Sequence, residues 1–143
     1  MRDLSSYDYA IVRVVPRVER GERMNIGVIV SCPAREYLQA KIEIDEVRLR
    51  ALDETLDLDA IRRHAASIPA ICEGGPNAGP IGRLSQRERF HWLVAPRSTI
   101  IQVSPVHTGQ CSDPTKVLEH LVSQLVRPLK SPEGLATKST KST

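Results

Sequence analysis

The stretch Tyr7-Asp-Tyr-Ala-Ile-Val-Arg-Val-Val-Pro16, followed after a charged segment by Ile26-Gly-Val-Ile-Val-Ser-Cys-Pro33, decides the fold. Both runs are rich in β-branched residues, are largely apolar on both faces and stop at a proline, so they predict two buried strands. The charged segment 16–25 between them contains Gly21 and predicts a long hairpin connection. Gly27 lies inside the second strand, where a glycine often marks a bulge or the close approach of another backbone.

A third strand is predicted over residues 37–44, which alternate between apolar and polar side chains. Apolar residues from Leu38 to Ile44 fall on one face, and residues from Tyr37 to Glu43 fall on the other. This pattern is typical of a half-buried strand whose outer face meets water.

Helical periodicity begins after this strand. Residues 45–54 predict a short acidic helix, and apolar residues spaced by three or four predict an amphipathic helix over 58–72. Asp57 is a suitable N-cap for the second helix, and Pro69 is expected to kink or end it. Residues 73–80 include three glycines and two prolines and predict a loop.

The last part of the chain predicts a helix, a strand and a second helix. Ser85 and Glu88 match a capping box, which marks the start of a short helix. Residues 99–104 predict a fourth strand. Asp113 and the proline after it then predict the start of a helix whose apolar stripe runs to Val126.

The order of these elements predicts an α+β fold, with a mostly antiparallel sheet of about four strands and helices packed on one face. A length of 143 residues fits one domain, which we expect over residues 1–130. Residues 131–143 are rich in Ser, Thr and Lys and almost free of large apolar side chains, so they predict a disordered tail.

The formal charge of +3 is unevenly distributed. Residues 10–35 hold five arginines and two acids, whereas residues 43–59 hold seven acids and two arginines. The pattern predicts either an ordinary solvated surface of both signs or a polarised surface that steers an anionic ligand or partner. Residues 1–126 are neutral overall and aromatic residues make up only 3%, which disfavours a dedicated nucleic-acid binder.

The cysteines and the apolar runs bear on location and cofactors. Cys32, Cys72 and Cys111 are odd in number and widely spaced, which predicts neither a disulfide framework nor a standard zinc site. No run reaches the length of a membrane helix, and the first residues lack the apolar core of a signal peptide. We therefore expect a cytoplasmic protein without membrane contact, metal or cofactor.

A first group of candidate site residues stands where the second strand begins. Glu22, Arg23 and Asn25 place a carboxylate, a guanidinium and an amide at one strand end. One interpretation is a recognition corner in which Arg23 grips a phosphate or a carboxylate with two hydrogen bonds. The alternative is that Asn25 closes the hairpin and Glu22 pairs locally with an arginine.

A second group flanks the predicted fourth strand. Arg97, Ser98 and Thr99 precede it and can present a guanidinium, hydroxyls and backbone amides to an oxyanion, or form a turn that caps itself. His107 and Thr108 follow it, where the imidazole would suit acid–base work or be purely structural. We expect the early and late groups to meet at one rim around a positively charged pocket.

Six segments also carry a resemblance to a known family: Tyr7–Pro16, Glu22–Ile29, Gly79–Leu84, Arg87–Trp92, Ala95–Thr99 and Pro105–Gly109. Together they resemble the bacterial family called domain of unknown function 3037, and the resemblance spans roughly residues 7–127. It implies no established activity and no catalytic residues. It implies a HipA-like kinase as a protein partner, because family members are often found beside such a kinase.

These observations favour a binding protein that acts as an accessory or neutralising partner of a kinase-like protein. The acidic stretch Glu43–Asp59 is expected to meet a basic partner surface. The alternative is an enzyme for a phosphate-containing substrate, with His107 as acid or base and with Arg23 and Arg97 stabilising anionic charge. A third hypothesis is weak nucleic-acid binding through the arginine-rich hairpin and the basic tail. The sequence leaves the oligomeric state open.

Overall fold

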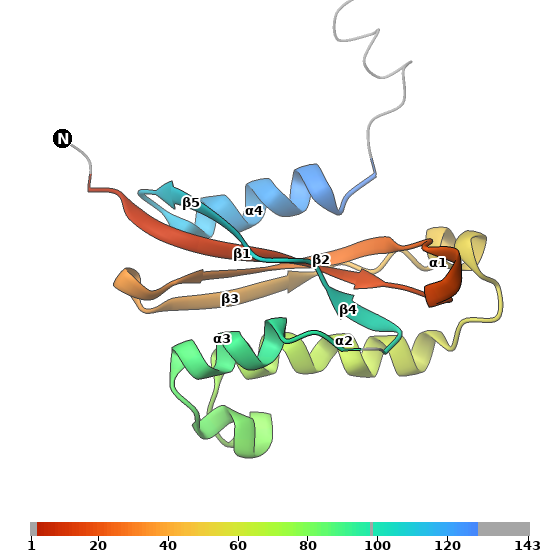
Figure 1. Cartoon of the computed structure of the whole chain (residues 1–143), viewed down its shortest axis with the longest axis horizontal. Coiled ribbons are helices and arrows are strands. Elements are labelled where there is room, and N and C mark those ends of the chain that lie inside the picture. The colour runs from red at the N-terminus through yellow and green to blue at the C-terminus, as the bar shows by residue number, and fades with distance from the viewer. Residues whose placement is uncertain (1–2, 98, 129–143) are drawn as a thin grey trace, which may run out of the picture.

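The computed structural model describes residues 3–97 and 99–128, and the predicted tail over 131–143 lies outside this part. Within it, five strands form one antiparallel sheet in the order β3-β2-β1-β4, with β5 also paired to β1 (Figure 1). The predicted α+β fold with an antiparallel sheet is confirmed. The strands are β1 (Ser5–Val14), β2 (Met24–Cys32), β3 (Tyr37–Ile42), β4 (Ile101–Val103) and β5 (His107–Cys111).

The helices begin at the caps that the sequence predicts. The side chains of Asp57 and Asp113 each accept a hydrogen bond from a backbone N–H of the first turn, and Ser85 with Glu88 forms a complete capping box. These caps satisfy donors that have no partner inside the helix. The helices are α1 (Glu46–Leu52), α2 (Leu58–Glu73), α3 (Gln86–Val94) and α4 (Pro114–Leu125).

Two local expectations for the middle of the chain need correction. Of the two effects expected of Pro69, ending the helix is wrong, because α2 continues to Glu73 before Gly74 closes it with a hydrogen bond to the Ala70 carbonyl. The glycine- and proline-rich segment predicted as a loop is largely a run of 3₁₀ turns over Pro76–Arg83. Proline fixes φ near the value that such turns need, so prolines in this segment favour the turns that it forms.

Helices cover both faces of the sheet, so the prediction that they pack on one face is wrong. In Figure 1, α4 lies along one side of the sheet, and α2 and α3 lie along the other. On the α4 side, Val28 and Val30 of β2 pack against Leu118, Val122 and Val126. The face of β3 that was expected to meet water is therefore partly covered by α4, because β2 and its neighbours are apolar on both sides.

The opposite face holds the larger core. It gathers apolar side chains from the three long strands, from α2 and α3 and from β4, and most of them are fully buried. Burying each of these side chains stabilises the fold by about 1.5–3 kcal/mol relative to leaving it exposed. The buried core members on β1 to β3 and on α2 are Val12, Val14, Ile26, Ile29, Leu38, Leu58, Ile61, Ala65, Ile68, Ile71 and Cys72.

A bulge in β2 fixes which side chains of the hairpin face which helix. Val12 pairs with Gly27 while Arg13 pairs with Asn25, so Ile26 is an extra residue in β2. Ile26 packs in the α2 core, and Asn25 turns to the α4 side, where its amide donates a hydrogen bond to the Leu125 carbonyl. The bulge predicted from the glycine is confirmed, and it decides where the polar residues before it point.

The bulge depends on a close approach between β2 and β3. A Cβ added at Gly27 would lie 2.5 Å from Ile42 Cδ1 and 2.7 Å from the Lys41 carbonyl oxygen. Neither separation is compatible with van der Waals contact, and the second atom belongs to the backbone. Glycine is therefore required at this position by packing.

The fifth strand is the element that the sequence did not predict. His107–Cys111 is polar and contains a glycine, so it has little strand propensity of its own. Pairing with the long, apolar β1 overrides this weakness, and Gly109 lies opposite Tyr7, whose ring occupies the space above it. Residues expected only to follow the fourth strand therefore form a fifth strand at the edge of the sheet.

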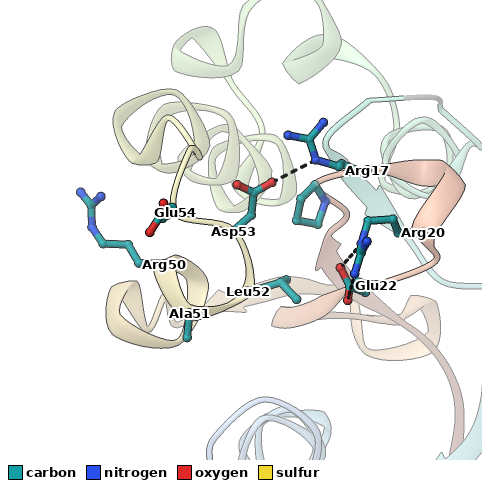
Figure 2. A pocket seen from close by; sticks show the side chains of 9 residues that line it. Arg17, Arg20, Glu22, Arg50, Ala51, Leu52, Asp53 and Glu54 are labelled. Atoms are coloured by element: carbon teal, nitrogen blue, oxygen red, sulfur yellow. Dashed lines mark hydrogen bonds and ion pairs between the residues drawn. The ribbon is translucent and has the colours of Figure 1, made fainter.

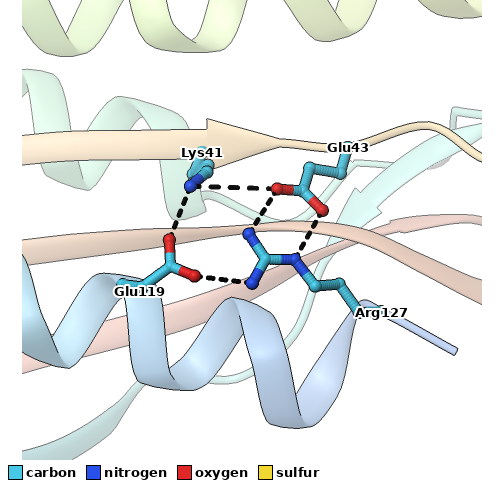
Figure 3. Close-up of polar contacts among 4 residues, drawn as sticks. All are labelled: Lys41, Glu43, Glu119 and Arg127. Carbon is cyan, nitrogen blue, oxygen red and sulfur yellow. Dashed lines mark hydrogen bonds and ion pairs between the residues drawn. The ribbon is translucent and has the colours of Figure 1, made fainter. Parts of the chain in front are cut away.

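Four charged side chains fasten α4 to β3 (Figure 3). Arg127 donates two hydrogen bonds to Glu43, at 2.9 and 2.7 Å, and one to Glu119 at 2.5 Å. Lys41 Nζ donates to Glu119 at 2.6 Å and lies 3.8 Å from Glu43. The hydrogen bonds from Arg127 and Lys41 lower the pKa of Glu119 to about 2, so both carboxylates stay charged around these cations.

Replacing Gly27 by alanine tests the close approach of β2 and β3. We expect Gly27→Ala to lower the free energy of unfolding by about 1–3 kcal/mol, because the new methyl group meets backbone that cannot move aside. Urea denaturation of the purified protein measures this loss. Gly109→Ala is the matched variant, since its Cβ would meet the Tyr7 side chain, which can turn. Equal losses for the two variants would contradict the argument.

The charged network predicts a dependence of stability on pH. The pKa of Glu119 is about 2 in the folded chain and about 4.3 in an unfolded one, so the network stabilises the protein above pH 5. This contribution is lost as the pH falls towards 2. We expect the Tm difference between the parent and Glu119→Gln to be largest at pH 7 and to vanish near pH 2.

Glu36→Gln is the control for the pH series. Glu36 is exposed on a turn and forms no ion pair with any residue in the ranges 3–97 and 99–128. Its substitution should leave a Tm difference that is small and independent of pH. A Glu119→Gln variant that behaves like Glu36→Gln would show that the network does not hold α4 in solution.

Candidate functional site

The hairpin residues Arg23 and Asn25 line a cavity at the C-terminal end of α4. Its volume is about 310 Å³, and Arg48 of α1 faces it from the other side. Leu125 and Val126 close its floor. The two hairpin residues and the helix residue come from distant parts of the sequence, and only Asn25 of the hairpin pair lies within β2.

The end of α4 is neutralised by donors from the cavity wall. Asn25 Nδ2 donates to the Leu125 carbonyl at 2.9 Å, and Arg48 Nη1 lies 3.4 Å from the Val126 carbonyl. These contacts offset part of the negative end of the helix dipole, which carries unsatisfied carbonyl groups. The Arg48 contact is long, so its guanidinium keeps donors for other ligands.

Arg13 of β1 neighbours the residues of this cavity without lining it. It is the cross-strand partner of Asn25, and its Nε is buried without a hydrogen-bond partner among the residues that the structure describes. Burial, and secondly the nearby charge of Arg23, lower the pKa of Arg13. Two like charges are therefore held close together, one of them with an unsatisfied donor.

No carboxylate of the described residues lies within ion-pair distance of Arg13, Arg23 or Arg48. Arg13 and Arg48 are half-buried and Arg23 is exposed, and a charge without a counter-charge is costly at the two half-buried positions. We name these three arginines, with Asn25, the arginine cluster. It is the candidate functional site, and its chemistry suits an anion.

Glu22 lies outside the arginine cluster, in a second cavity of about 450 Å³ between the hairpin tip and α1 (Figure 2). Arg20 grips it with two hydrogen bonds of 2.8 and 3.0 Å, which lower the pKa of Glu22. Arg17 lies 3.6 Å from Asp53 in the same cavity. The charges here pair with each other, as the local alternative for Glu22 predicts.

Arg97 is engaged with its own helix. Its guanidinium donates to the Trp92 carbonyl at 2.6 Å and the Leu93 carbonyl at 3.3 Å, and its Cζ lies 4.2 Å from the Trp92 ring centroid. These contacts cap the end of α3 and form a cation–π pair. The Thr99 hydroxyl donates to the Ile101 carbonyl at 2.6 Å, and Ser98 lies outside the described residues.

His107 and Thr108 stand at a third place, on β5. The exposed imidazole of His107 stacks on the Tyr9 ring at a centroid distance of 5.1 Å. The Thr108 hydroxyl donates to Asp8 at 2.8 Å. Both side chains therefore make local contacts with β1.

The expectation of one shared rim is wrong. Arg23 and Asn25 face the α4 side of the sheet, whereas Arg97 lines a small cavity with Ile68 and Trp92 on the α2 side. The sheet lies between them. The physical reason is the turn after α3, where Arg97 folds back on the helix carbonyls instead of reaching the hairpin.

The chain matches the model of one protein family over most of its length. The model of the family described as protein of unknown function (DUF3037) matches residues 9–126. The chain belongs to this family. The resemblance seen in the sequence is thus confirmed, and the matched range includes every residue of the arginine cluster in this DUF3037 protein. The chain matches no curated protein and no solved structure.

The DUF3037 chain offers little for other chemistry within its described part. Burial raises the pKa of the Cys72 thiol to about 12, which keeps it protonated near neutral pH, and burial also raises the pKa of Cys111. Over residues 3–97 and 99–128 no group of histidine, cysteine or acidic side chains is placed to hold a metal ion. None of the helices in these ranges has the length and apolar character needed to cross a membrane.

Sequence reasoning missed Arg13 and Arg48 of the cluster. A signal for Arg13 exists, because it is the single charged residue in the apolar run Tyr9–Val15. A charge in a strand that is buried on both faces needs a counter-charge or a ligand. Arg48 gives no such signal, since it sits in a short helix of mixed charge.

The missing partner of Arg13 predicts that this DUF3037 protein is stabilised when the charge is removed. We expect Arg13→Met to raise the free energy of unfolding by about 1 kcal/mol, because the unsatisfied donor and the repulsion from Arg23 disappear while the aliphatic stem remains. Urea denaturation measures the change. Arg87→Met, on the exposed face of α3, should change it by less than about 0.5 kcal/mol. A loss of stability in Arg13→Met would show that its guanidinium is satisfied in solution.

Proposed function

We propose that the chain is a cytoplasmic binding protein that acts as an accessory or neutralising partner of a kinase-like protein. The observation that carries the proposal is the arginine cluster, whose guanidinium groups have no carboxylate partner in the described part of the chain. An anionic group on a partner would supply the missing charge. The family resemblance suggests the HipA-like kinase, and the cluster suggests the chemistry of the contact.

The neighbouring surface gives such a contact an orientation. The segment after α1 and the start of α2 carry the exposed acids Glu54, Asp57 and Asp59, of which Glu54 lines the second cavity. A partner that presents an anionic group to the arginine cluster and basic groups to this acidic surface matches both signs at once. Such complementarity raises association rates and excludes partners of the wrong polarity.

The enzyme alternative lacks the geometry that it needs. His107 pairs with Tyr9, which lies four residues and so about 13 Å along β1 from Arg13. Arg97 lies on the other face of the sheet. An acid or base must reach the reacting group through a hydrogen bond or one water, and these residues do not surround a common substrate.

Co-expression of the chain with a HipA-like kinase tests the proposal. We expect the two proteins to co-elute in size-exclusion chromatography, and the double variant Arg23→Glu/Arg48→Glu to weaken binding by about tenfold or more in titration calorimetry. Removing one partner of a desolvated charge contact typically costs about 2–5 kcal/mol, and reversing its charge costs at least as much.

The matched control is Arg63→Glu/Arg87→Glu, which makes the same change in net charge on the exposed faces of α2 and α3. It should retain binding within about twofold. Circular dichroism checks that each variant is folded. If no complex forms at micromolar concentrations, or if both double variants bind equally, the proposed function is wrong.

A further inference from the structure

The arginine cluster gathers three arginines that have no carboxylate partner among the described residues. Arg17, Arg20, Arg62 and Arg127 each pair with a carboxylate, and Arg97 is held by carbonyl groups and an aromatic ring. The cluster instead places two guanidinium groups near each other with a buried donor left open. A folded protein keeps such an arrangement where a ligand completes it.

From this geometry we infer that the arginine cluster binds a phosphate group, using the side chains of Arg13, Arg23 and Arg48. The inference rests on the proposed function, because it identifies the anionic group that the protein partner presents to the cluster as a phosphate. The same chemistry can come from a phosphorylated side chain of a protein or from free phosphate.

The composition of the cluster selects a phosphate over a carboxylate. Three guanidinium groups carry three positive charges, and a phosphate monoester carries about −1.5 to −2 near neutral pH whereas a carboxylate carries −1. The guanidinium groups come from β1, from the hairpin residue just before β2 and from α1, so donors arrive from three parts of the fold. Arginine forks bind phosphate oxygens in pairs, and three oxygens of a phosphate can each accept such bonds.

The floor of the cavity is compatible with an anion for a specific reason. The carbonyl groups of Leu125 and Val126 would repel phosphate, but Asn25 and Arg48 already donate towards them. Arg13 Nε remains the donor without a partner. Phosphate in the cavity therefore needs no rearrangement of α4, and a phosphate oxygen placed at Arg13 Nε would be the acceptor that this donor lacks.

Arginine side-chain NMR and thermal unfolding test the inference on the full chain. We expect phosphoserine or inorganic phosphate to shift the Nε–Hε resonance of Arg13 and to raise Tm with concentration, as binding to the folded state requires. Acetate at equal ionic strength should do neither. Binding should weaken from pH 8 to pH 5.5, as the ligand loses its second negative charge.

Arg23→Gln should weaken phosphate binding by about tenfold or more, because a charge-assisted contact is worth about 1.5–3 kcal/mol. Arg87→Gln makes the same charge change at an exposed site and should leave the affinity within about twofold. Equal effects of the two variants, or equal responses to phosphate and acetate, would overturn the inference.

An experiment with the kinase-like partner distinguishes failure of this inference from failure of the proposed function. The kinase-like protein is tested before and after phosphatase treatment, alongside free phosphate as a competitor. Loss of the complex on dephosphorylation supports a phosphorylated side chain as the source, and an unchanged complex that phosphate cannot displace overturns the inference while leaving the proposed function standing. Phosphate binding without any complex supports the free anion and overturns the proposed function alone.

Discussion

The close approach of β3 to β2 at Gly27 is the constraint on which the arrangement of the molecule depends. Any side chain there would collide with the backbone of β3, so the two strands keep their register only with glycine. Ile26 is the extra residue next to Gly27, and its side chain packs in the α2 core. Because of this extra residue, the side chains before it point to the opposite faces of the sheet from those that regular alternation would give. One local irregularity therefore divides the hairpin into an apolar side that stabilises the fold and a polar side that faces α4.

The docking of α4 depends on apolar packing more than on charge. Val28, Val30 and Val122 are fully buried, and each contributes about 1.5–3 kcal/mol, whereas an exposed ion pair contributes about 0–1 kcal/mol. The network around Arg127 and Glu119 instead sets the position of the helix end along β3. That end forms the floor of the arginine cluster, so the interactions that place α4 also shape the candidate site.

The sequence predicts those parts of the fold that local pattern controls. The apolar runs give β1 and β2, the capping residues Asp57 and Asp113 give the helix starts, and Gly27 gives the bulge. It could not predict β5, because this largely polar five-residue segment becomes a strand only through pairing with β1. The expectation that Arg23 and Arg97 lie together was wrong. Nothing in the sequence near Arg97 indicates that this side chain folds back onto the carbonyl groups of α3.

The pairing of Arg97 with Trp92 has a consequence for optical spectroscopy. Trp92 is the single tryptophan of the chain, and a guanidinium lies over its ring at the end of α3. The indole emission therefore reports whether this helix end is intact, since separating the cation from the ring changes the polarity around the fluorophore. The sheet separates it from Arg23, so the same emission is a clean measure of unfolding even while an anion occupies the other face.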